Sequence, residues 1–70
     1  MAMQMMKVKS SNVASIGYDE ASKTMRVQFN NGGTYEYRGV DRQTYESLMA
    51  SKSPGQALRS AVAGLEYSRL

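Results

Sequence analysis

The residues in this sequence that could do chemistry are basic, aromatic or hydroxyl-bearing, because the sequence contains neither cysteine nor histidine. The absence of both removes thiolate and imidazole nucleophiles and the ligands of most zinc sites. The acidic residues are scattered, no phosphate-binding loop of the Walker type is present, and no base accompanies Ser10, Ser11 or Ser53. An active site needs a nucleophile, a base and a stabilising group within reach of one another. We therefore expect a protein that is not an enzyme and that uses no metal and no cofactor.

Binding is the chemistry that remains, and two groups of residues offer it. Arg26 and Arg38 lie on the polar face of two expected strands, where they could contact phosphates or a partner protein. On one of these strands, Tyr35 and Tyr37 could form a stacking platform for bases, as strand aromatics do in proteins that bind single strands. The second group surrounds the expected start of a helix, where unpaired backbone N–H groups favour anions. It consists of Lys52, Ser53, Gly55 and Arg59.

Each group also has an ordinary structural explanation, and the sequence favours that explanation in every case. Tyr35 and Tyr37 align with the apolar positions of the preceding strand, which is typical of core residues beneath helices. Arg26 can pair with Glu36 on a solvated sheet face, since one polar face is normal for an antiparallel sheet. Ser53 can serve as a simple helix cap.

Length and charge narrow the class of protein. The 70 residues make one domain, and small domains bury little surface, so we expect a homo-oligomer that gains stability by self-association. The net charge of +3 permits a nucleic acid or a nucleotide as partner without requiring one. No stretch approaches the roughly 20 apolar residues that cross a bilayer, so we expect no membrane partner and a cytoplasmic location. Residues 1–7 are expected to form a disordered leader.

The elements that must position these residues begin with three strands, expected at residues 12–18, 24–29 and 34–38. Strict alternation of apolar and polar residues marks the second strand, and Ala14, Ile16 and Tyr18 share one face of the first. A three-residue loop ending at Gly32 places Val27 opposite Tyr35 and keeps the apolar faces aligned, with the loop's glycine in the left-handed region.

Two helices are expected to follow the strands. Asp41 is a suitable N-cap for the first helix, and Ser53, Pro54 and Gln56 predict a capping box with proline at the first helical position of the second. Helices packed on the apolar face of an antiparallel sheet define an α+β fold. The predicted order is β-β-β-α-α, a three-stranded antiparallel meander followed by two helices on one face.

The order and spacing of several short motifs resemble the KTSC domain family across roughly residues 8 to 67. The mark of that family is a Tyr-x-Tyr motif, here Tyr35-Glu36-Tyr37, and the sequence departs from the family pattern after Gly55, where it has Ala57-Leu58. The other matching motifs are Ser10-Ser11-Asn12-Val13, Ile16-Gly17-Tyr18-Asp19, Met25-Val27-Phe29, Gly32, Val40, Tyr45, Leu48 and Ser53-Pro54-Gly55.

The resemblance implies a single KTSC-like domain over residues 8–70 and brings no catalytic residues with it. The family is found at the C-terminus of some lysyl-tRNA synthetases and as free-standing bacterial proteins, a context that has suggested RNA binding. We therefore expect a non-enzymatic binding domain for a phosphate-bearing ligand, which is RNA, another single-stranded nucleic acid, or a nucleotide that a small oligomer could sequester. The alternative is a protein-interaction or homo-oligomeric assembly module, with close helix approach at Ala61, Ala63 and Gly64.

Overall fold

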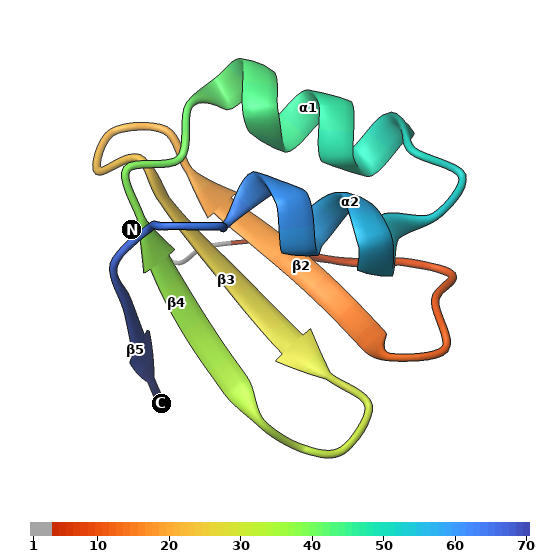
Figure 1. Cartoon of the computed structure of the whole chain (residues 1–70). Coiled ribbons are helices and arrows are strands. Elements are labelled where there is room, and N and C mark those ends of the chain that lie inside the picture. The colour runs from red at the N-terminus through yellow and green to blue at the C-terminus, as the bar shows by residue number, and fades with distance from the viewer. Residues whose placement is uncertain (1–3) are drawn as a thin grey trace.

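The fold of the chain, taken from a computed structural model that describes residues 4–70, is α+β, with two helices on one face of an antiparallel sheet (Figure 1). The sheet order β1-β2-β3-β4-β5 follows the sequence, so every strand pairs with its neighbour in the sheet without a crossover. The elements are β1 (Met5–Lys7), β2 (Val13–Asp19), β3 (Thr24–Phe29), β4 (Thr34–Arg38), α1 (Arg42–Ala50), α2 (Pro54–Ala61) and β5 (Tyr67–Arg69).

The hydrophobic core lies between the central strands and the two helices. In β3 and β4, alternate residues face the helices, so the apolar positions that the sequence spaces two apart in these strands lie toward this layer. Both helices contribute one deeply buried leucine each, which fixes them on the sheet. The buried core residues are Val13, Ile16, Met25, Val27, Val40, Leu48 and Leu58.

The β3–β4 hairpin has the register that the sequence predicted. Val27 lies opposite Tyr35 and Met25 opposite Tyr37. The backbone N–H of Phe29 donates to the carbonyl of Gly33 at 2.8 Å, which closes the three-residue loop. Gly32 has a φ of +95°, the left-handed conformation that this loop requires at its third position. The arginines of both strands are thereby directed away from the helices.

In β2, the alternation predicted for Ala14 was wrong. A register shift between Val13 and Ser15 inserts one extra residue against β3, and such a bulge reverses the alternation on its two sides. Val13 is therefore 1% exposed and packs in the core, whereas Ala14 is only partly buried. Beyond the bulge, Ile16 lies opposite Val27 on the core face, as predicted.

Two edge strands extend the sheet beyond the predicted three-stranded meander. Residues 5–7, expected within a disordered leader, form β1, where Met6 pairs with Ile16. Residues 67–69 form β5, where Tyr67 pairs with Tyr37. Strands of three residues are too short to show a two-residue period, which explains why the sequence pattern missed both. The first three residues of the expected leader lie outside the described residues.

Both helices begin where the sequence placed them, but without the predicted caps. Asp41 and Ser53 occupy the N-cap positions, and neither side chain makes a capping hydrogen bond. The backbone N–H of Ser53 donates instead to Ser51 Oγ at 3.1 Å, and the Asp41 carboxylate lies 3.6 Å from Lys23. The capping box expected with Gln56 is therefore not formed. Neither helix in the described part of the chain has the length and apolarity to cross a membrane.

Candidate binding site

The residues that the sequence marked for binding lie on two opposite faces of the sheet. In β3, Met25 and Val27 face the core, so the side chain between them, that of Arg26, faces outward. Arg38 lies opposite Thr24 on this outer face. The other predicted residues lie on the helix side, so the structure does not bring the full predicted set together; they are Tyr37, Lys52, Ser53, Gly55 and Arg59.

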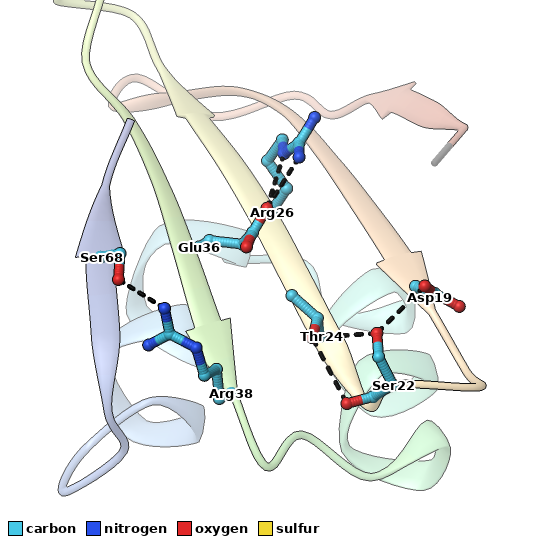
Figure 2. Close-up of polar contacts among 7 residues, drawn as sticks. All are labelled: Asp19, Ser22, Thr24, Arg26, Glu36, Arg38 and Ser68. Atoms are coloured by element: carbon cyan, nitrogen blue, oxygen red, sulfur yellow. Dashed lines mark hydrogen bonds and ion pairs between the residues drawn. The ribbon is translucent and has the colours of Figure 1, made fainter. Parts of the chain in front are cut away.

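Polar groups on the outer face of the sheet bind one another (Figure 2). The guanidinium of Arg26 donates from Nε at 3.2 Å and from Nη2 at 2.7 Å to the same Oε2 of Glu36. Arg38 donates to the hydroxyl of Ser68 in β5. Glu36 neutralises the charge of Arg26, whereas the partner of Arg38 is a hydroxyl, so Arg26 is the less available of the two arginines to an anion.

On the helix side, a hollow of about 640 Å³ opens between α2, the β3–β4 loop and the segment before β2. We call it the α2 hollow. Aromatic rings from β3 and β4 and aliphatic side chains from α2 form its apolar walls, while amides and one guanidinium supply its polar groups. Its lining residues are Ser11, Asn12, Val13, Phe29, Asn30, Asn31, Tyr37, Gly55, Leu58, Arg59 and Val62.

A second hollow, of about 470 Å³, adjoins the first at the start of α2 and is lined in part by Lys9, Lys52 and Arg59. Arg59 lines both hollows, and within residues 4–70 no acidic residue lines either one. The four ion pairs found within residues 4–70 use Lys23, Arg26 and Arg42 as their cations. The three cations at the hollows therefore have no carboxylate partner in the described part of the chain and carry an unneutralised positive charge.

Gly55 has a packing role that explains its position between the two hollows. A Cβ built on it would lie 3.2 Å from Ser10 Oγ. That oxygen accepts hydrogen bonds from the backbone N–H groups of Asn12 and Val13, and the amide of Asn30 donates to the carbonyl of Ser10. The bare glycine thus lets a hydrogen-bonded loop lie against the first turn of α2, and this contact shapes the wall between the hollows.

Aromatic residues continue from the α2 hollow toward the β5 edge. The Tyr35 ring centroid lies 5.6 Å from that of Phe29, 6.5 Å from that of Tyr37 and 5.9 Å from that of Tyr67. These four residues form what we call the aromatic cluster. The guanidinium of Arg69 lies 5.9 Å from the Tyr35 ring centroid, within the range of a cation–π contact.

The two tyrosines of the Tyr-x-Tyr motif face the helix side, as the register argument predicted, yet they are only half buried. No helix lies over β5 in Figure 1, and the hairpin ends of β3 and β4 extend beyond both helices in that view. Burial raises the pKa of the Tyr37 hydroxyl, with smaller contributions from Tyr35 and Tyr67. Like other tyrosines with a pKa of 10.0 or above, Tyr37 is uncharged near neutral pH, and its hydroxyl can donate a hydrogen bond to an anion.

Several residues of this region were not singled out as binding residues from the sequence. Tyr67 and Arg69 belong to the three-residue strand β5, which is too short for a periodic signal in the sequence. Lys9 and Asn12 carry no local signal, because only the fold brings them beside α2. Among residues 4–70, no group of three or more His, Cys, Asp or Glu side chains could hold a metal ion.

Comparison of the chain with known proteins finds a matching family model and similar proteins. The KTSC domain family model matches residues 9–67. An uncharacterized protein of Stutzerimonas stutzeri (strain A1501) is 30% identical over 54 residues, which cover 77% of this chain and 76% of that protein. The crystal structure of a KTSC domain protein from Yersinia pestis is similar with a TM-score of 0.93 and 33% identity, over 99% of both chains.

Proposed function

The chain belongs to the KTSC domain family, and we propose that it is a non-enzymatic binding domain whose α2 hollow takes a phosphate-bearing ligand, either a single-stranded nucleic acid or a nucleotide. One observation carries the proposal. Phe29, Tyr37 and Arg59 line the same hollow, Lys9 and Lys52 line the adjoining one, and none of the described residues in either lining is acidic.

Each half of a nucleotide has a matching group in this arrangement. A base can stack on the aromatic wall, an interaction worth about 1–3 kcal/mol per base in single-strand binders. The cations attract the phosphates, and binding releases counterions that were condensed on the nucleic acid. The binding affinity should therefore fall as the salt concentration rises. Asn12 and Asn31 also line this hollow. The Asn12 amide can offer a donor and an acceptor to base edges or ribose hydroxyls, and Asn31, whose Oδ1 accepts from the Gly33 N–H at 2.9 Å, can offer its amide donors.

A direct test compares charge reversals on the two sides of the sheet. The double variant K52E/R59E should bind a labelled uridine oligonucleotide at least tenfold more weakly than the unmodified chain in low salt, measured by fluorescence anisotropy. The control K7E/R38E changes the net charge equally on the outer face, where Lys7 and Arg38 lie, and should change the affinity less than twofold. Circular dichroism checks that both variants fold. No affinity of the unmodified chain for oligonucleotides or nucleotides in low salt would remove the proposal, as would equal losses in both variants.

Self-association is a second candidate function, because large apolar side chains are exposed at both edges of the sheet. Met6 in β1 is 46% exposed, and Tyr67 and Leu70 at the β5 end are 61% and 60% exposed. An edge strand with free backbone groups can pair with another strand. Light scattering at high micromolar concentration tests this candidate: a dimer or larger assembly supports it, and a monomer removes it.

A further inference from the structure

β5 carries an aromatic side chain that lies mostly outside the hydrophobic core. Tyr67 is 61% exposed, although it lies opposite Tyr37 on the helix-side face. Its ring centroid is 5.9 Å from that of Tyr37, and Tyr37 lines the α2 hollow while Tyr67 does not. An aromatic surface therefore continues out of the hollow and across the edge of the sheet.

A cation lies beside this outer part of the aromatic cluster. Arg69 is opposite Tyr35, on the same face as Tyr67, and it takes part in none of the ion pairs found within residues 4–70. The combination of ring and cation that is found in the α2 hollow thus occurs a second time at β5. A mononucleotide has one base and would use only one of the two positions.

We infer that the ligand of this site is a single-stranded oligonucleotide, with one base in the α2 hollow and the next stacked on Tyr67, and a phosphate near Arg69. The inference rests on the proposed function and narrows its ligand class. Bases within a duplex are already stacked on each other and do not reach such rings, whereas the splayed bases of a single strand do. Aromatic grooves also suit proline-rich peptides. A polyanion is favoured here because four cations have no carboxylate partner within residues 4–70, namely Lys9, Lys52, Arg59 and Arg69.

The test is a length series measured by isothermal titration calorimetry in low salt, with uridine monophosphate and uridine oligonucleotides of two and four residues. Affinity should rise at least tenfold from the monophosphate to the tetranucleotide, because a second base then stacks. The variant Y67L should weaken tetranucleotide binding about tenfold and leave monophosphate binding unchanged. The variant Y67F keeps the ring and should bind as the unmodified chain does. R69Q should reduce the slope of log affinity against log salt concentration for the tetranucleotide by the amount expected for the loss of about one phosphate contact.

The outcomes separate this inference from the proposed function. The inference is overturned, and the proposed function stands, if the tetranucleotide binds no more tightly than the monophosphate. The same follows if Y67L and Y67F bind the tetranucleotide with equal affinity. Binding of a proline-rich peptide that Y67L abolishes, together with no binding of either the monophosphate or the tetranucleotide, would overturn both. Because β5 is a three-residue edge strand, the folding of Y67L has to be checked. A native circular dichroism spectrum and an unchanged affinity for the monophosphate would together show that Y67L weakens tetranucleotide binding without unfolding.

Discussion

Arg26 and Arg59 are both arginines that the sequence marked for binding, yet they are in opposite situations. The guanidinium of Arg26 makes two hydrogen bonds to one Glu36 oxygen on the outer face of the sheet. Arg59 lines both hollows on the helix side and has no ion-pair partner within residues 4–70. The comparison teaches that a charge is available to a ligand only where the fold leaves it without an internal partner. We therefore expect Arg26 to contribute to stability and Arg59 to binding.

The largest difference between the two sides should come from truncating Leu58, which is 3% exposed beneath the α2 hollow. Replacing a buried leucine with alanine removes packing and leaves a cavity, so L58A should lower the free energy of unfolding by about 2–5 kcal/mol. The control K7A, at an exposed position of the outer face, should change it by less than about 0.5 kcal/mol. Urea denaturation followed by circular dichroism measures both. Equal losses in the two variants would contradict the assignment of the core to the helix side.

A smaller effect should separate the two arginines directly. R26Q removes the charge beside Glu36, whose side chain is 22% exposed, and should lower the free energy of unfolding by about 1 kcal/mol. R59Q breaks no ion pair of the described chain and should leave stability within about 0.5 kcal/mol of the unmodified chain, while it weakens oligonucleotide binding. The prediction is contradicted if R26Q weakens oligonucleotide binding and R59Q lowers the free energy of unfolding. Arg26 would then be the ligand contact and Arg59 the structural residue.

The smallest effect concerns Tyr37 at alkaline pH. Its folded-state pKa is raised above 10.0, chiefly by burial, so above that pH the unfolded chain loses the proton first. The stability linked to Tyr37 is complete below pH 10.0 and is lost as pH rises through the folded pKa. Y37F should show a shallower fall in unfolding free energy between neutral and strongly alkaline pH, measured by urea denaturation. An identical fall would show that Tyr37 ionises equally in both states. Tyr18 also has a raised pKa and accounts for part of the remaining fall.

The sequence was sufficient for the centre of the fold and insufficient for its edges. The hairpin register followed from the alternation of Met25 and Val27 with polar residues and from a glycine at the turn, which are local signals. The bulge beside Ala14 depends on pairing with β3, and the strands at Met5–Lys7 and Tyr67–Arg69 depend on neighbours already in place. Tertiary pairing decided these features, so local periodicity could not reveal them.

The candidate site was predictable only in its parts. Lys52, Gly55 and Arg59 were found because they surround a recognisable helix start, and Tyr37 because it belongs to a strand motif. Their meeting with Asn12 and Phe29 in one hollow follows from how α2 lies on the sheet, which no spacing in the sequence encodes. The pairing of Arg26 with Glu36 was an alternative that the sequence offered and the structure confirmed.

The side of the sheet that meets the ligand can be read from the arginine side chains themselves. In two-dimensional ¹H–¹⁵N NMR spectra, the Nε–Hε signal of Arg59 should shift as a uridine tetranucleotide is added in low salt. The corresponding signal of Arg26, whose Nε donates to Glu36 at 3.2 Å, should stay in place. Shifts of the Arg26 and Arg38 signals with an unmoved Arg59 signal would place the ligand on the outer face and contradict the account.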